Sequence, residues 1–117
     1  MLKKNKKIKF SYVIPVYNEE NNIEPLLREL LNSLKPYLKK INYEIIFIDD
    51  GSTDNTIKKL EKVKKENKNL KIIRLGMNYG KSMALSAGFH CSNGDIIVTI
   101  DGDLQDNPAD VFKLYEK

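Results

Sequence analysis

Two aspartates, Asp101 and Asp103, follow directly on the apolar run Ile96–Ile100, which is rich in β-branched residues. Such a run predicts a strand buried on both faces, so the acids lie at its carboxyl end. If the chain stays extended, their side chains point the same way and lie roughly 6 to 7 Å apart. Two carboxylates at that distance repel by about 2 to 3 kcal/mol at an effective dielectric of about 20. A divalent cation, Mg²⁺ or Mn²⁺, would remove this cost and would complete its shell with water and nucleotide phosphates.

The same acids also have a simpler interpretation. An Asp-x-Asp pair after a strand is often a solvated turn, and Asp106, two residues before Pro108, can act as a helix cap. Taken alone, the pair therefore leaves both a metal site and a capped turn open.

Apolar runs alternate with helical patterns along the chain. The expected strands are Lys9–Val16, Tyr43–Ile48, Leu70–Leu75 and Ile96–Ile100. The first expected helix starts at Ile23 after a cap at Asn21 or Asn22 and ends or kinks at Pro36. The second runs from a cap at Thr53 or Asp54 to Asn67, the third spans Lys81–Cys91, and a fourth begins at Ala109. This alternation predicts an α/β fold, a Rossmann-like parallel sheet with helices on both faces.

Helical spacing also assigns residues to the core. The inward positions are Ile23, Leu26, Leu27, Leu30, Leu31, Leu34 and Leu38, then Ile57, Leu60 and Val63, then a small-residue face of Ala84, Ala87, Gly88 and Cys91. We expect Cys91, the one cysteine, in the core and His90, the one histidine, on the helix surface.

Polar residues follow three of the four expected strands. In parallel sheets of this kind, ligands bind beyond the carboxyl ends of the strands, near the point where the strand order reverses. The residues delivered to that edge are Tyr17 and Glu19, Asp49 and Asp50, and Asp101 and Asp103. Their convergence predicts a binding site.

Composition narrows the class of protein. The 117 residues make one domain, with 41% hydrophobic residues and no apolar run near the roughly 20 residues that cross a bilayer. The net charge of +4 comes largely from lysines in the amino-terminal tail and in Lys58–Lys71. These lysines allow a weak attraction to anionic lipid or nucleic acid. No aromatic residues interleave the lysines of the tail, which favours a solvated basic face over either. A single cysteine excludes a disulfide framework and fits a reducing compartment.

Two other functions have partial support in the sequence. The string Gly76–Ser82 lies between a strand and a helix and imitates a phosphate-binding P-loop, but three residues separate its glycines where four are required. Lys81 is then interpreted as a solvated lysine of the first helical turn. A phospho-acceptor signalling domain has this length and clustered aspartates, but it needs an acceptor aspartate after the third strand, which here ends in Leu75-Gly76.

Four strings together resemble the amino-terminal half of a family 2 glycosyltransferase of the GT-A fold. They are IPVYNEENNI, YEIIFIDDGSTDNT, NYGKSMALSAG and GDIIVTIDGDLQDNP, in the order and at the spacing of the family. The resemblance extends to the polyprenyl-phosphate and dolichol-phosphate sugar transferases and covers nearly the whole chain.

The resemblance implies a nucleotide-sugar site with named residues. Pro15, Tyr17 and Glu19 would surround the base and ribose, Ile48 and Asp50 would hold the base, Asp101 and Gly102 would lie beside the ribose and diphosphate, and Asp103 and Gln105 would hold Mg²⁺ or Mn²⁺. Asp101 and Asp103 are the expected catalytic pair. The family more often has alanine where Gly102 stands, a change that keeps close backbone approach.

The resemblance also implies partners and a place of action. It implies an inverting transfer of a sugar from a nucleoside diphosphate, with a UDP-sugar favoured over GDP-mannose, to a lipid-linked phosphate. Members of the family continue well past this length, so residues 1–117 are expected to be the donor-binding part of a truncated domain, with the acceptor half missing. We expect a cytoplasmic protein acting at the cytoplasmic face of a membrane, with no transmembrane segment of its own here. A donor-binding fragment without transferase activity is the alternative.

Overall fold

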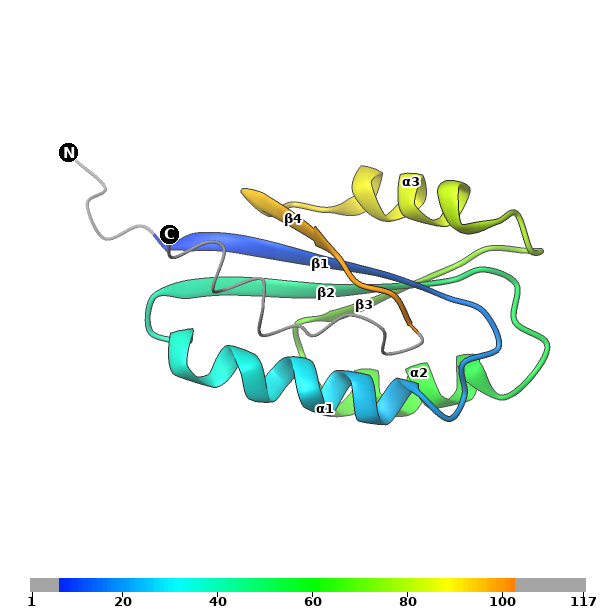
Figure 1. Ribbon diagram of the computed structural model, residues 1–117, viewed down its shortest axis with the longest axis horizontal. Coiled ribbons are helices and arrows are strands. Elements are labelled where there is room, and N and C mark those ends of the chain that lie inside the picture. The colour runs from blue at the N-terminus through cyan, green and yellow to red at the C-terminus, as the bar shows by residue number, and fades with distance from the viewer. Residues whose placement is uncertain (1–6, 103–117) are drawn as a thin grey trace.

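A computed structural model describes residues 7–102 as one parallel sheet covered by helices (Figure 1). The elements are β1 (Ile8–Val16), α1 (Ile23–Leu34), the 3₁₀ turn η1 (Lys35–Tyr37), β2 (Ile41–Asp49), α2 (Thr56–Glu66), β3 (Leu70–Arg74), α3 (Lys81–Cys91) and β4 (Ile96–Thr99). The expected α/β architecture is therefore confirmed over the described residues. The expected helix from Ala109 lies outside them.

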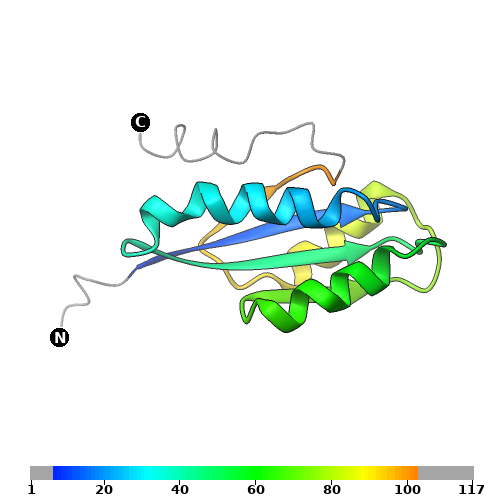
Figure 2. The same cartoon turned by 90° about the horizontal axis from the view of Figure 1, so that it is seen from below.

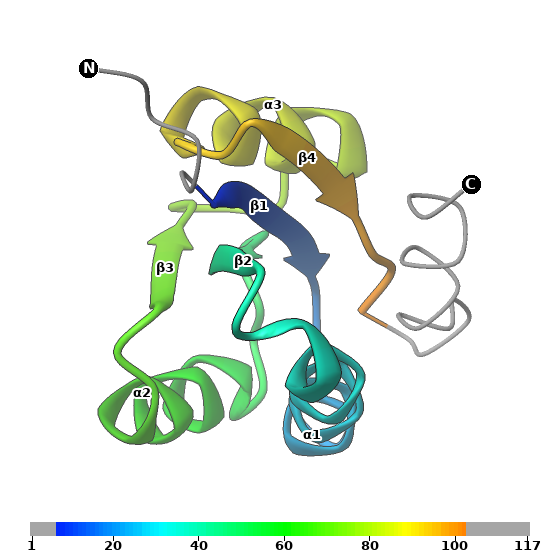
Figure 3. The ribbon, with the colours of Figure 1, turned by 90° about the vertical axis from the view of Figure 1, so that its left-hand side faces the viewer.

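The sheet order is β3-β2-β1-β4, and all three pairings are parallel. Helices α1 and α2 cover one face, whereas α3 lies on the other (Figures 2 and 3). The chain builds outward from β1 to β3 and then crosses back to β4, which reverses the winding direction between β1 and β4. A phospho-acceptor domain of the flavodoxin-like type has β3 beside β1, so this order excludes that alternative.

Alternation along β1 explains the two cores. Phe10, Tyr12, Ile14 and Val16 are buried in a cluster with α1 and α2. Val13, between them, packs with Ile46, Ile48 and Ala84 on the α3 side. A strand with a helix layer on each face has no polar side to show, which is why residues 12–16 of β1 and residues 45–48 of β2 are apolar.

Helix α3 approaches the sheet closely at Gly88. A Cβ atom added there would lie 2.8 Å from Cδ1 of Ile48 and would also overlap the side chain of Val13. The glycine is therefore required by packing, as the expected small-residue face suggested. Ala84 and Gly88 are buried, but Cys91 is exposed, so the expected place of this thiol in the core is wrong.

The burial of β4 differs from expectation. Val98 and Ile100 are buried, but Ile97 is 43% exposed and Thr99 is exposed. The latter two lie on the α3 face of the sheet, where α3 packs mainly against β1 and β2. The expected burial on both faces is therefore wrong for the described part of the chain.

The helix ends also differ in detail. Helix α1 ends at Leu34 and Pro36 lies in the 3₁₀ turn, as expected, which leaves Leu38 outside the helix and 42% exposed. Asn55, rather than Thr53 or Asp54, flanks the start of α2. Asp54 nevertheless supplies the cap interaction, because its Oδ1 accepts the Thr56 N–H at 2.9 Å.

Glu44 on β2 joins four parts of the fold while being only 3% exposed. Its carboxylate accepts hydrogen bonds from Ser11 Oγ at 2.5 Å and from the Asn93 N–H at 2.6 Å, and it lies 2.8 Å from Lys71 Nζ. Burial alone would raise the pKa of Glu44, but these interactions with Lys71, Ser11 and Asn93 outweigh it and hold the pKa at about 2. Through these hydrogen bonds the Glu44 carboxylate holds the turn before β4 against β1 and β2 of the sheet.

This lowered pKa predicts a loss of stability in acid. The ionised Glu44 carboxylate contributes about 3 kcal/mol to the free energy of unfolding. This stabilisation is fully present above about pH 4.5, the pKa of the group in the unfolded chain, and is lost as the pH falls toward 2. Denaturant unfolding of the wild type and of Glu44→Gln between pH 5 and 2 measures this, with the exposed Glu66→Gln as the control. An equally steep acid limb in Glu44→Gln would contradict the assignment.

Candidate functional site

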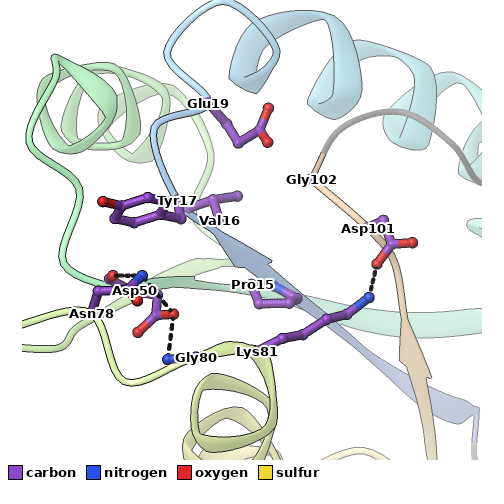
Figure 4. Close-up of a pocket in the computed structure, with 10 residues that line it drawn as sticks. All are labelled: Pro15, Val16, Tyr17, Glu19, Asp50, Asn78, Gly80, Lys81, Asp101 and Gly102. Carbon is purple, nitrogen blue, oxygen red and sulfur yellow. Dashed lines mark hydrogen bonds and ion pairs between the residues drawn. The ribbon is translucent and has the colours of Figure 1, made fainter.

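A pocket of about 420 Å³ opens at the carboxyl edge of the sheet, where the winding direction reverses. Its walls come from the ends of β1 and β2, from the loop before α3, and from the segment after β4 (Figure 4). The residues that line it are Pro15, Val16, Tyr17, Glu19, Asp50, Asn78, Gly80, Lys81, Asp101 and Gly102. The volume lies in the range of small-molecule sites in proteins.

Two loops interlock to form one wall. The side-chain carbonyl of Asn18, a residue with a φ of 51°, accepts the N–H groups of Thr53 at 2.8 Å and of Asp54 at 3.3 Å. The Asn18 N–H in turn donates to Ser52 Oγ at 2.8 Å, and the Glu19 N–H donates to Thr56 Oγ1 at 2.9 Å. These bonds hold the segment that carries Tyr17 and Glu19 against the loop after β2. The Glu19 carboxylate also accepts a hydrogen bond from Asn22 Nδ2 at 2.6 Å.

Asp50 lies at the base of the pocket, at the end of β2, and is 4% exposed. Its Oδ1 accepts the Tyr79 N–H at 2.8 Å, and its Oδ2 accepts the Gly80 N–H at 3.0 Å and Asn78 Nδ2 at 3.2 Å. The neighbouring Asp49 is also buried, and its Oδ1 accepts the Ser52 N–H at 3.2 Å. Each carboxylate therefore stabilises a different loop of the site.

Lys81 and Asp101 form an ion pair across the pocket (Figure 4). Lys81 is the first residue of α3, and Asp101 follows β4. The interpretation of Lys81 as a solvated first-turn lysine is incomplete, because its ammonium group reaches the tip of the acid-ended strand. The pair links the two elements on the α3 side of the pocket.

Gly102 brings the end of the fourth strand close to β1. A Cβ atom there would lie 2.8 Å from Val16 Cγ1 and 3.0 Å from the Pro15 carbonyl oxygen. An alanine at this position would require the Val16 side chain to move, so Gly102 permits closer packing of the two segments than alanine would.

Six of the residues expected from the sequence meet in this pocket, namely Pro15, Tyr17, Glu19, Asp50, Asp101 and Gly102. Ile48 does not line it, because its side chain is fully buried between the sheet and α3. Asp103 and Gln105, the expected metal ligands, lie outside the described residues. Among residues 7–102, no group of three or more histidine, cysteine, aspartate or glutamate side chains is arranged to hold a metal ion.

Sequence reasoning missed Val16, Asn78, Gly80 and Lys81 as residues of the pocket. The signal for the last three was present, since Gly76–Ser82 joins a strand to a helix at the same edge as the acids. The string differs from a P-loop in structure as well as in spacing. The backbone N–H groups of Tyr79 and Gly80 bind the Asp50 carboxylate, whereas those of a P-loop surround phosphates.

The pocket is acidic. Among the described residues that line it, Glu19, Asp50 and Asp101 are carboxylates, and Lys81 is a cation. An anionic ligand placed there would meet net repulsion unless a cation accompanied it.

None of the helices described between residues 7 and 102 has the length and apolar character needed to span a membrane.

Comparison with known proteins agrees with this geometry. Over 110 residues the chain is 46% identical to an uncharacterized glycosyltransferase of Synechocystis, covering 94% of this chain and 34% of the relative. It is 42% identical over 107 residues to the undecaprenyl-phosphate 4-deoxy-4-formamido-L-arabinose transferase of Proteus mirabilis, covering 91% of this chain and 32% of that enzyme. The chain therefore spans about a third of the length of these curated relatives.

A solved structure shows the same fold. The mannosyltransferase of Pyrobaculum calidifontis, in complex with GDP-Man and Mn²⁺, superposes with a TM-score of 0.73 at 25% identity, over 84% of this chain and 28% of that one. The parallel sheet with helices on both faces is thus the GT-A fold of glycosyltransferases. The model of glycosyl transferase family 2 matches residues 11–117, and the chain belongs to that family.

Proposed function

We propose that this chain binds a nucleoside diphosphate sugar and supplies the donor side of an inverting transfer to a polyprenyl phosphate. The observation that carries the proposal is the convergence of Tyr17, Glu19, Asp50 and Asp101 in one pocket at the β1/β4 reversal. A pocket at this place in a parallel sheet is where nucleotides bind. The name of the Proteus mirabilis relative supports undecaprenyl phosphate as the type of acceptor.

Each wall of the pocket has a proposed role toward the donor. Pro15, Tyr17 and Glu19 surround the base and ribose, Asp50 holds the base with Ile48 behind it, and Asp101 and Gly102 lie beside the ribose and diphosphate. Ile48 would contribute through packing or its backbone, because its side chain is buried. Lys81 adds a cation that can meet the phosphates.

A divalent cation fits this donor set. Asp103 and Gln105 would hold Mg²⁺ or Mn²⁺ together with oxygens of the diphosphate, since Mg²⁺ commonly uses few protein ligands and several from water or phosphate. The acidic lining of the pocket supports a need for this cation, because a diphosphate without a metal ion would face three carboxylates there. When bound, the cation would neutralise the charge that develops on the departing diphosphate.

The residues of the chain position the reaction. Asp101 and Asp103 are the proposed catalytic pair, acting beside the anomeric carbon and the diphosphate. A phosphate acceptor is already ionised near neutral pH, so the transfer needs no strong general base from this part of the protein. Resemblance of the string DLQDNP to bacterial polyprenyl-phosphate transferases favours a uridine donor, with GDP-mannose as the alternative.

The acceptor side is expected from sequence that the longer relatives contain. This chain corresponds to about a third of their length, and the region they share contains the donor pocket. Alignment of two reactants can supply on the order of 7 to 11 kcal/mol of barrier reduction, so donor binding alone would give no measurable transfer. Transfer to a lipid acceptor would take place at the cytoplasmic face of a membrane.

A transfer assay tests the proposal. Residues 1–117, and a chimera that joins them to the remaining sequence of the Proteus mirabilis enzyme, are incubated with radiolabelled UDP-glucose or GDP-mannose, Mn²⁺ and polyprenyl phosphate. We expect label in the extracted lipid with the chimera only. Label with residues 1–117 alone would show a complete active site, whereas a folded chimera that transfers from neither donor would refute transfer from UDP-glucose and from GDP-mannose.

A further inference from the structure

One carboxylate fastens the loop between β3 and α3. Asp50 accepts hydrogen bonds from two successive backbone N–H groups, Tyr79 and Gly80, and from the side chain of Asn78. Asn78 Nδ2 also donates to the Asp50 carbonyl oxygen at 3.1 Å. These four contacts join residue 50 to three consecutive residues of the loop.

The contacts leave this loop little freedom to bind a phosphate through its backbone. Asp50 is 4% exposed, and a carboxylate so buried is stable only while its hydrogen bonds persist. Its negative charge lies at the start of α3, where the helix dipole favours an anion. The place that a phosphate would take at the helix N-terminus is therefore already filled by the protein's own carboxylate.

Close backbone packing supports the same contact. Gly51 has a φ of 76°, and a Cβ atom there would lie 2.5 Å from the Asn78 nitrogen and 2.8 Å from the Met77 carbonyl oxygen. The loop thus lies directly against residues 50 and 51. Its last residue, Gly80, precedes Lys81, so the position of the Lys81 ammonium group depends on where Asp50 holds the loop.

We propose that Asp50 is a positioning residue that acts on the diphosphate end of the donor through this loop. By binding Tyr79 and Gly80, it places Lys81 opposite Asp101, where the ammonium group meets the phosphates of the ligand. This inference rests on the proposed donor function. It adds to a contact between Asp50 and the base, because a carboxylate has about four acceptor positions and the loop takes three of them.

The two roles of Asp50 predict different ligand dependence. A residue that contacts only the base affects binding of a nucleoside diphosphate and leaves inorganic diphosphate unaffected. A residue that places Lys81 affects both ligands, because both present phosphates to the same ammonium group.

The experiment uses Asp50→Asn, which keeps the side-chain shape but replaces one acceptor oxygen by a donor. With Mn²⁺ present, we expect binding of UDP and of inorganic diphosphate to weaken about tenfold or more, each measured by calorimetry. Lys81→Met should weaken the binding of inorganic diphosphate to a similar degree. Amide hydrogen exchange at Tyr79 and Gly80 should become faster in Asp50→Asn and stay unchanged in Lys81→Met.

Asp49→Asn is the matched control, since it removes the neighbouring buried carboxylate, which accepts a hydrogen bond from the Ser52 N–H in the loop after β2. It should leave the exchange of Tyr79 and Gly80 unchanged. Unaltered diphosphate affinity in Asp50→Asn, or unaltered exchange at both amides, would overturn the inference. If the wild type binds neither ligand, the donor proposal fails with it, while the exchange rates still show whether Asp50 holds the loop.

Discussion

Replacing Asp103 by asparagine is expected to abolish the metal-dependent part of donor binding and to leave the fold intact. The substitution removes the charge of a proposed metal ligand and lowers the repulsion among the acids beyond β4. We expect the affinity for UDP in the presence of Mn²⁺ to fall by about 100-fold, which corresponds to about 2.7 kcal/mol. Calorimetric titration with and without Mn²⁺ measures the change.

Glu66→Gln is the control for this experiment, because it removes one exposed acid of α2 at a distance from the pocket lining. Its titration should match the wild type. An Asp103→Asn protein that still gains affinity from Mn²⁺ as the wild type does would show that the metal is held by other residues.

Replacing Gly51 by alanine is expected to lower the free energy of unfolding by about 2 to 5 kcal/mol. A left-handed backbone costs a residue with a Cβ about 1 to 2 kcal/mol, and overpacking adds about 1 to 3 kcal/mol. The atoms that a Cβ would meet belong to the backbone of Met77 and Asn78, which cannot rotate away as a side chain can. Denaturant unfolding monitored by circular dichroism measures the loss.

The matched control is Gly76→Ala in the same loop, where an added Cβ meets nothing within 4 Å. It should change stability by less than about 0.5 kcal/mol. Equal stability of the two alanine variants would show that the loop moves away from residue 51 at little cost, which would also weaken the role given to Asp50.

The pattern of the sequence located the strands and helices of residues 7–102 to within a few residues. The alternation of strand and helix patterns predicts a parallel sheet with helices on both faces, and the structure has both layers. The exposed face of β4 could not be predicted in this way, because an apolar strand has the same composition whether or not a helix covers it. Within residues 7–102, Ile97 is exposed because α3 packs mainly against β1 and β2.

The pattern predicted the orientation of α3 but not the exposure of its end. Helical spacing correctly placed Ala84 and Gly88 against the sheet, but it placed Cys91, the last residue of the helix, on the same face, and that thiol is exposed. The requirement for glycine at position 88 comes from close contact with Val13 and Ile48. These two residues lie on β1 and β2, so the local sequence of the helix does not reveal the contact.

The candidate site was predicted at the level of the sheet edge but not of its contacts. Strand ends brought Tyr17, Asp50 and Asp101 together as expected. The pairing of Lys81 with Asp101 joins residues 20 positions apart, and the bonds of Asp50 reach 29 and 30 positions along the chain. Such contacts depend on how the loops pack, for which a local pattern has no signal.

A metal-dependent donor site can be tested by titrating this chain with UDP and with GDP, each with Mn²⁺ and again with a chelator. We expect saturable binding of a nucleoside diphosphate in the presence of Mn²⁺, stronger for UDP, that is lost when the chelator removes the metal. Amide exchange in the bound state should slow at the pocket segments around Tyr17, Asp50 and Lys81. Binding of neither nucleotide, or binding with equal affinity in the chelator and without protection of these segments, would contradict a metal-dependent donor site at the carboxyl edge of the sheet.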